Sequence, residues 1–165
     1  MADGRIWTGL QLVCFNRGNR ARFEDILGLI NRPSFDVLAL SEMSSVQEIV
    51  QRFVAHPRYG VIQFPGVPGA SGNPIVYNKE RMRLEAADHH FLLPEAVRAG
   101  THNQQKNLII GRFTHLPSEQ IVWVGSFHNI QHQDEGNRGA VAREAVQRIV
   151  QFVDGMERPV FLGGD

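Results

Sequence analysis

Phe35-Asp36-Val37-Leu38-Ala39-Leu40-Ser41-Glu42 is a continuous apolar run that ends in a carboxylate. The pattern recurs in Ile121-Val122-Trp123-Val124-Gly125-Ser126-Phe127-His128-Asn129, which ends in an imidazole and an amide, and in Pro159-Val160-Phe161-Leu162-Gly163-Gly164-Asp165. Apolar runs of this length predict strands that are covered on both faces. Because α/β sheets place ligands just beyond the carboxyl ends of such strands, Glu42, His128 and Asp165 are the first candidates for a functional site.

The composition of the chain sets bounds on its class. With 165 residues, the sequence predicts a single domain over 1–165 that is large enough to bury a substantial core. Lys plus Arg and Asp plus Glu number 17 each, so a nucleic-acid partner would have to be held by a local basic patch. The single cysteine, Cys14, excludes an intrachain disulfide, favours a reducing compartment and is expected to be a small core residue. The sequence shows no signal region and no apolar run of membrane-spanning length, so we expect a cytoplasmic protein without a membrane partner.

Three helices are predicted from apolar residues that recur at helical spacing. The first carries Phe23, Ile26, Leu27 and Ile30 and is closed by Pro33. The second begins with the capping box Ser45-x-x-Glu48 and carries Val46, Ile49, Val50 and Phe53. The third runs from Arg138 to Val153 with a broad apolar face made by Val141, Ala142, Ala145, Val146, Ile149, Phe152 and Val153.

The remaining strands indicate how the sheets are built. A first strand, Gly9 to Phe15, ends at Asn16, and a short strand covers Val61 to Phe64. Two hairpins are expected, one pairing Pro74–Tyr77 with Met82–His90 and one pairing Leu108–Phe113 with Ile121–Phe127. On the first of these, Tyr77 is expected to be a core residue, and the adjacent His89 and His90 are expected to face opposite sides. Hairpins in the middle of the chain with helices near its ends predict two mixed sheets in a sandwich flanked by helices.

These motifs, taken in order, resemble the endonuclease/exonuclease/phosphatase superfamily, which has the DNase I-like fold. The resemblance rests on Asn16 after the first strand, on Asp36-Val-Leu-Ala-Leu-Ser-Glu42, on the Gly72–Tyr77 strand, on the strand ending at His128, and on Pro159-Val-Phe-Leu-Gly-Gly-Asp165. It implies a four-layered α/β (α+β) sandwich and hydrolysis of a phosphoester, either a small molecule or a nucleic acid, with Mg²⁺ or Mn²⁺ as cofactor.

The sequence departs from the family pattern at several places. Ser41 stands where the family has Gln, and Asn129 follows His128 where the family has an apolar residue. The Asn of the Gly-Asp-Phe-Asn motif and a later Ser-Asp-His segment are absent, so we expect the domain to be incomplete at its C-terminus and the chain to be a fragment, inactive or weakly active by itself. The departures also leave open a relative of the same fold that binds and does not catalyse.

The resemblance assigns roles to individual residues. Glu42 and Asp165 would bind the metal, and Asp165 would also orient or deprotonate the attacking water. His128 would assist the leaving group, which suits a side chain that exchanges protons near neutral pH. Asn16 would position water or phosphate. The alternatives are a solvated acid for Glu42, a turn residue for Asn16 and a structural imidazole for His128.

Two further clusters of polar residues, one of arginines and one of histidine and acidic residues, suggest separate binding sites. Arg17, Arg20 and Arg22 precede a helix whose N-terminus carries partial positive charge, which favours a bound phosphate held by Arg17 and Arg20. Solvated arginines neutralised by neighbouring acids are an equally good explanation. After His128, a polar loop with His132, Asp134 and Glu135 offers a rival transition-metal site, although its spacing matches no known zinc motif.

Overall fold

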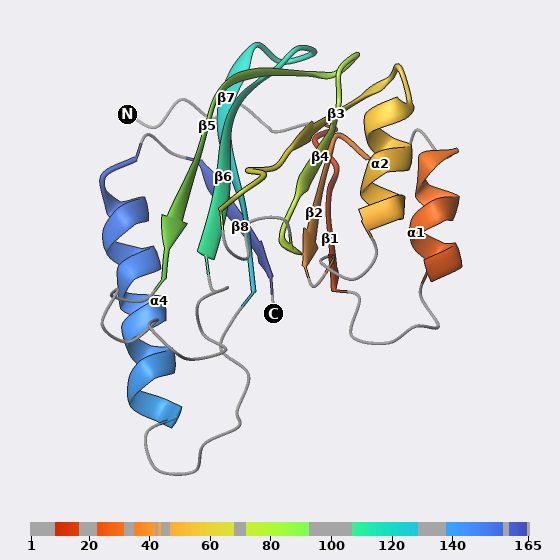
Figure 1. The fold of residues 1–165 in the computed structure, drawn as a ribbon. Helices are drawn as coiled ribbons and strands as arrows, with labels where there is room; N and C mark the ends of the chain where they lie inside the picture. The colour runs from red at the N-terminus through yellow and green to blue at the C-terminus, as the bar shows by residue number, and fades with distance from the viewer. Residues whose placement is uncertain are drawn as a thin grey trace.

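Two four-stranded sheets pack face to face in the computed structural model, which describes residues 9–16, 23–31, 35–41, 43, 47–67, 72–92, 107–128, 138–156 and 159–164 (Figure 1). The first sheet contains, in spatial order, β1 (Leu12–Asn16), β2 (Val37–Ser41), β4 (Ile75–Asn78) and β3 (Tyr59–Ile62). The second contains β5 (Met82–Phe91), β6 (Asn107–His115), β7 (Gln120–Phe127) and β8 (Val160–Gly164). Both sheets are mixed, because β1 and β2 are parallel, β7 and β8 are parallel, and the other pairs are antiparallel.

Helices cover the outer faces of the two sheets. Figure 1 shows α1 (Phe23–Ile30) and α2 (Gln47–Ala55) beside the first sheet and α4 (Arg138–Asp154) beside the second. Three apolar clusters fill the spaces between these layers, one under α1 and α2, one between the sheets and one under α4. The order helices, sheet, sheet, helix confirms the predicted four-layered sandwich.

β2 is buried on both faces, as its continuous apolar sequence predicts. All five of its residues are buried. Leu38 and Leu40 pack in the cluster under the helices, whereas Val37 packs in the cluster between the sheets. Because side chains alternate along a strand, Ala39 and Ser41 share the face of Val37 and lie toward the second sheet.

The predicted pairing of Pro74–Tyr77 with Met82–His90 is wrong. β4 pairs on its two sides with β2 and β3, while β5 pairs with β6, so the turn at residues 79–81 carries the chain from one sheet to the other. The reason lies in the burial of the two strands. Ile75 and Val76 are both fully buried, as in a central strand, whereas β5 is largely exposed from Glu85 to Asp88, as in an edge strand. The second predicted hairpin, made by β6 and β7, is confirmed.

Several residues expected in the core are exposed. Cys14 is exposed, and so are Phe161 and Leu162, because β1 and β8 are edge strands of their sheets. On α4 one residue of the predicted apolar face is about half exposed, since Ala145 and Ile149 are buried but Val146 is not. Ser45 of the predicted capping box lies outside the described residues, and Glu48 lies in the first turn of α2. None of the helices in the described segments combines the length and the apolar character that crossing a membrane would require.

We expect Gly163→Ala to destabilise the protein by about 1–3 kcal/mol, the usual cost of overpacking a core. A Cβ at Gly163 would lie 2.1 Å from Cys14 Sγ and 3.1 Å from Ala39 Cβ, so the Cys14 side chain would have to rotate and β1, β2 or β8 would have to shift slightly. Urea unfolding measures the change. Gly28→Ala in α1 is the matched control, because its Cβ would meet no atom within 4 Å. Equal stability of Gly163→Ala and wild type would contradict this packing.

Candidate active site at the strand ends

Four strands end at one edge of the sandwich. In the first sheet, parallel β1 and β2 end in register, with Asn16 opposite Ser41. In the second sheet, parallel β7 and β8 end in register, with Phe127 opposite Gly164. Figure 1 shows the end of β8 close to the ends of β1 and β2.

Contacts between the sheets bring these four ends together. The buried Ser126 hydroxyl on β7 donates a hydrogen bond to the Leu40 carbonyl oxygen on β2, at 2.7 Å. Gly163 on β8 lies directly against Cys14 on β1 and Ala39 on β2. Each of these residues lies one or two positions before the end of its strand, so the chain leaves all four strands within a small region.

The opposite edge of the sandwich confirms that β2 and β7 run in the same direction. Asp36 immediately precedes β2, and His115 pairs with Gln120 at the start of β7. His115 Nε2 lies 3.8 Å from Asp36 Oδ2, so the two strands also begin side by side. Strands that begin together and touch near their ends must carry the residues that follow them to the same edge.

The structure places the predicted site residues only in part. Asn16 is the last residue of β1. His128 directly follows β7 and is half-buried. The side chain of Asn16 lies outside the described structure, as do Glu42, Asp165, Arg17 and Arg20, and the rival loop with His132, Asp134 and Glu135.

The chemistry of the candidate ligands fits a hard divalent cation. Carboxylate oxygens are donors that Mg²⁺ prefers, and both predicted metal ligands, Glu42 and Asp165, are carboxylates. The structure adds one observation at this edge: Ser41 Oγ is buried and has no hydrogen-bond partner among the described residues. Within the segments that the structure describes, no group of three His, Cys, Asp or Glu side chains could hold a metal ion.

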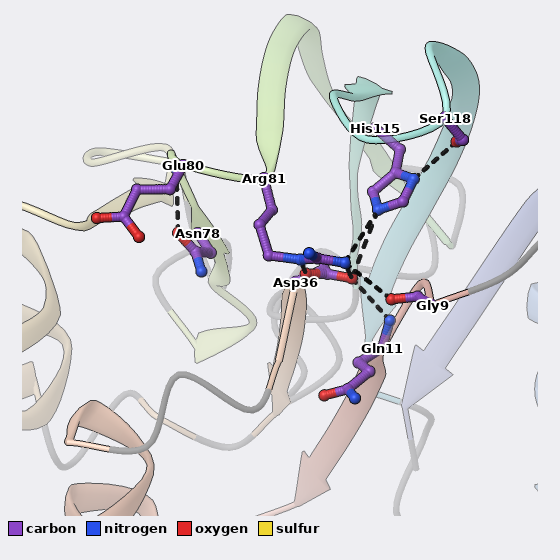
Figure 2. Close-up of polar contacts among 8 residues, drawn as sticks. All are labelled: Gly9, Gln11, Asp36, Asn78, Glu80, Arg81, His115 and Ser118. Carbon is purple, nitrogen blue, oxygen red and sulfur yellow. Dashed lines mark hydrogen bonds and ion pairs between the residues drawn. The ribbon is translucent and has the colours of Figure 1, made fainter.

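A second polar cluster, the Asp36 cluster, lies at the opposite edge and consists of Asp36, Arg81, His115 and Ser118 (Figure 2). The buried Asp36 carboxylate accepts hydrogen bonds from the Arg81 guanidinium and, at 2.8 Å, from the backbone N–H of Gln11. Arg81 Nη2 also donates to the Gly9 carbonyl oxygen at 3.0 Å. The cluster therefore links the turn at residues 79–81, between the two sheets, by hydrogen bonds to the starts of β1 and β2.

The protonation of His115 follows from its neighbours. Arg81 Nη2, 3.4 Å from His115 Nε2, can only donate, so Nε2 accepts and the proton resides on Nδ1. Nδ1–H then donates to Ser118 Oγ at 2.7 Å. A nucleophilic serine needs the opposite arrangement, in which the imidazole accepts the hydroxyl proton. The Ser118–His115–Asp36 constellation is therefore a structural link.

Protonation of His115 should destabilise the fold. Burial lowers the pKa of His115, the Asp36 carboxylate partly opposes this, and the Arg81 charge adds to the lowering. The unfolded chain would protonate this histidine below about pH 6.5, where the folded protein keeps it neutral. We therefore expect the free energy of unfolding to fall as the pH falls below about 6.5, toward the folded pKa.

Urea unfolding at pH 7.5 and pH 5.5 measures this effect. His115→Asn keeps a donor near Ser118 and does not titrate, so part of the pH dependence should disappear in this variant. Burial also lowers the pKa of His90, but that contribution is common to both proteins and cancels in the comparison. An unchanged pH dependence in His115→Asn would overturn the assignment.

Three side chains outside both clusters behave as the sequence predicts. Tyr77 packs against Phe113 with ring centroids 5.3 Å apart, within the cluster between the sheets. His89 packs on Phe64, and His90 packs on Phe152 of α4, so the two histidines face opposite sides of β5. Both histidines lie on the far edge strand of the second sheet, where β6 separates them from β7 and both β6 and β7 separate them from β8.

Comparison with known proteins identifies the fold. No protein-family model and no curated protein matches the chain. Solved structures do match it, including D. rerio TDP2 complexed with a single-strand DNA product (TM-score 0.69, 15% identity) and the human Nocturnin catalytic domain with bound sulfate (0.67, 16%). A third is an endonuclease/exonuclease/phosphatase from Bacteroides vulgatus (0.67, 16%). The chain has the DNase I-like fold.

The matches with these DNase I-like structures cover nearly all of this chain but a smaller part of each matched structure. Each match covers 94% of this chain, but only 60%, 64% and 65% of TDP2, Nocturnin and the Bacteroides protein, respectively. The chain thus spans about three fifths of the solved structures that it resembles. The fold implied by the sequence motifs is confirmed, and the roles of individual residues remain predictions.

Proposed function

We propose that this protein hydrolyses a phosphoester with the help of a divalent metal ion, Mg²⁺ or Mn²⁺. The observation that carries the proposal is the meeting of four strand ends at one edge of a DNase I-like sandwich. Asn16 and His128 lie at two of these ends, and Glu42 and Asp165 directly follow the other two.

Each residue has a role that its chemistry supports. Glu42 and Asp165 would hold the ion, which when bound supplies a Lewis acid for the charge that develops on the phosphate. Asn16 would donate a hydrogen bond to a phosphate oxygen. Arg17 and Arg20, directly after β1, would balance the negative charge of the phosphate.

Hydrolysis then needs two proton transfers. A water oxygen bonds to phosphorus while the ester P–O bond breaks. Asp165 accepts the proton of the attacking water, and His128 gives a proton to the departing oxygen. The sulfate in human Nocturnin and the DNA product in D. rerio TDP2 support an oxyanion or nucleic-acid substrate for this fold.

Replacing His128 by Ala should slow turnover by about 10²–10⁴-fold, the usual contribution of a positioned proton donor. His128 directly follows β7, and its removal leaves the proposed metal ligands in place. The measurement is steady-state hydrolysis together with Mg²⁺ binding by calorimetry. A variant that binds Mg²⁺ normally and turns over at the wild-type rate would remove His128 from the mechanism.

The function itself is tested with the full-length protein on a panel of phosphodiesters and phosphomonoesters, including single-stranded DNA and RNA. At least one substrate should be hydrolysed with Mg²⁺, and EDTA should abolish the reaction. Binding of the same compounds without hydrolysis would favour the non-catalytic relative, which the replacement of the family Gln by Ser41 supports.

A further inference from the structure

A cavity of about 520 Å³ lies between the outer face of the second sheet and the C-terminal end of α4. Pockets that hold small molecules have volumes of about 300–1,000 Å³, so this cavity is large enough for a ligand. Short side chains leave the space open, since Ala86 on β5 and Gly155 after α4 fill little of it. Its lining also includes Asp88, Ile110, Trp123 and Phe152.

The second sheet separates this cavity from the contacts between the sheets. Val122 and Val124 pack between the sheets, so Trp123, which lies between them on β7, faces the opposite side, under α4. Ile110 belongs to the same cluster under α4, and its register partner Asp88 shares that face. The cavity is therefore a place distinct from the strand ends of the candidate active site.

Trp123 brings a hydrogen-bond donor to the cavity. Its indole Nε1 is buried and has no hydrogen-bond partner among the residues that the structure describes. A buried indole N–H usually finds an acceptor, because leaving it without one is costly. Since Trp123 lines the cavity, an acceptor atom on a bound ligand would satisfy this N–H.

The charges around the cavity favour a cation. The Asp88 carboxylate is 65% exposed, and His90 Nε2 lies 3.3 Å from Asp88 Oδ2. Burial lowers the pKa of His90, although Asp88 partly opposes this, so near pH 7 the imidazole is neutral and Asp88 keeps its negative charge. The last turn of α4, which ends at Asp154, contains no basic residue to balance the partial negative charge of the helix end.

Arg112 is the basic residue to consider on this face, because it pairs with Trp123 in the strand register. It is not one of the residues that line the cavity. Hydrogen bonds from Thr114 and Arg83 lower the pKa of Glu85, and the positive charge of Arg112 adds to the lowering. Arg112 is therefore close enough to act on the Glu85 carboxylate, and the lining of the cavity itself contains an acid and no base.

We propose that this cavity binds a small aromatic molecule that carries a cationic amino group and a hydrogen-bond acceptor. The aromatic ring would pack against Trp123 and Phe152, the acceptor would receive the Trp123 N–H, and the amino group would pair with Asp88. The site goes beyond the proposed hydrolysis and does not depend on it, so binding can be measured without any substrate.

The first test is a titration of the full-length protein with tyramine, followed by NMR of the indole N–H signals. Tyramine combines an aromatic ring, a hydroxyl oxygen that accepts and an ammonium group. The Trp123 signal, identified by its loss in Trp123→Phe, should shift with a Kd of about 0.1–1 mM, which is within the bound for so small a ligand.

Two analogues of the same ring test the charge preference. The neutral para-ethylphenol should bind about 3–5-fold more weakly than tyramine, because it lacks the ion pair with an exposed carboxylate. The anionic para-hydroxyphenylpropionate should bind more weakly still. No shift of the Trp123 signal at tyramine concentrations well above the expected Kd, or equal affinities for the cation and the anion, would overturn the proposal.

The second test uses variants and calorimetry to assign binding to the cavity. Ala86→Leu fills the space and should weaken tyramine binding at least about 10-fold, as expected for a blocked site. Ala55→Leu, a matched change at an exposed position in α2, should bind normally. Both alanines are exposed, so an unchanged Tm should show that each variant folds. Normal binding by Ala86→Leu would overturn the proposal.

Two further variants separate the polar contacts. Asp88→Asn should weaken tyramine about 3–5-fold and leave para-ethylphenol unaffected, because only the charge is lost. Trp123→Phe keeps an aromatic ring without the N–H, so it should weaken both ligands about 5-fold, the usual contribution of one hydrogen bond. Loss of para-ethylphenol binding in Asp88→Asn, or unchanged binding of both ligands in Trp123→Phe, would contradict these contacts.

Discussion

Glu42→Gln is expected to lower Mg²⁺-dependent hydrolysis by at least about 10³-fold, because a metal ion supplies several kcal/mol of transition-state stabilisation and each 1.36 kcal/mol is tenfold in rate. The amide keeps the shape of the side chain but loses the negative charge that a hard cation needs. Because Gln has nearly the same size as Glu, the variant should fold normally. Steady-state rates over a range of Mg²⁺ concentrations measure the loss.

The control for this experiment is Glu48→Gln. Glu48 lies in the first turn of α2, is exposed, and carries the same charge a few residues further along the chain. Its replacement should leave the rate unchanged. Hydrolysis by Glu42→Gln at the rate of the control would mean that Glu42 does not bind the metal.

Arg81→Met is expected to destabilise the protein by about 2–4 kcal/mol, somewhat less than the ~3–5 kcal/mol for breaking a fully buried ion pair. The change leaves the Asp36 carboxylate, 2% exposed, without its cationic partner (Figure 2). The Arg81 side chain is itself 37% exposed, so water can replace it in part, which is the reason for the lower estimate. Urea unfolding at pH 7.5 measures the change.

Two controls make this result specific to the pair. Arg83→Met removes an arginine two positions away, whose pair with Glu85 is solvent-exposed, so its cost should be below about 1 kcal/mol. The double variant Asp36→Asn with Arg81→Met should recover part of the loss, because no buried charge is then left unpaired. Equal costs for Arg81→Met and Arg83→Met would contradict a buried role for Asp36.

The layers and the common edge at which the parallel strands end could be predicted from sequence. The run from Val37 to Ser41 is apolar at nearly every position, which requires cover on both faces, and helices and a second sheet provide it. Parallel strands that end in polar residues imply a common edge, and Asn16 opposite Ser41 confirms that edge in the first sheet.

The path between the sheets could not be predicted, because a short polar turn fits a hairpin and a crossing equally well. The choice depends on which strands fill the two sides of β4, and these come from distant parts of the chain. The exposure of Cys14 could not be predicted either. Its neighbours in the sequence are apolar, which favours burial, but the residue is exposed because β1 is an edge strand.

The Asp36 cluster was missed for a related reason. Its members come from three separated segments, and nothing near Arg81 or His115 indicates a partner. One signal was present: Asp36 directly precedes a strand covered on both faces, and a buried charge in such a place must be paired. Within the Asp-Val-Leu-Ala-Leu-Ser-Glu motif, the structure thus gives Asp36 a structural role at the edge where β2 begins, and Ser41 ends the strand at the other edge.

The location of a bound metal ion tests the central claim most directly. Crystals of the full-length protein soaked in Mn²⁺ should show an anomalous scattering peak beside the Glu42 carboxylate, at the edge where β1, β2, β7 and β8 end. A peak confined to the loop with His132, Asp134 and Glu135, or no peak at millimolar Mn²⁺, would contradict the proposal that these four strand ends form a metal-dependent phosphoester hydrolase site.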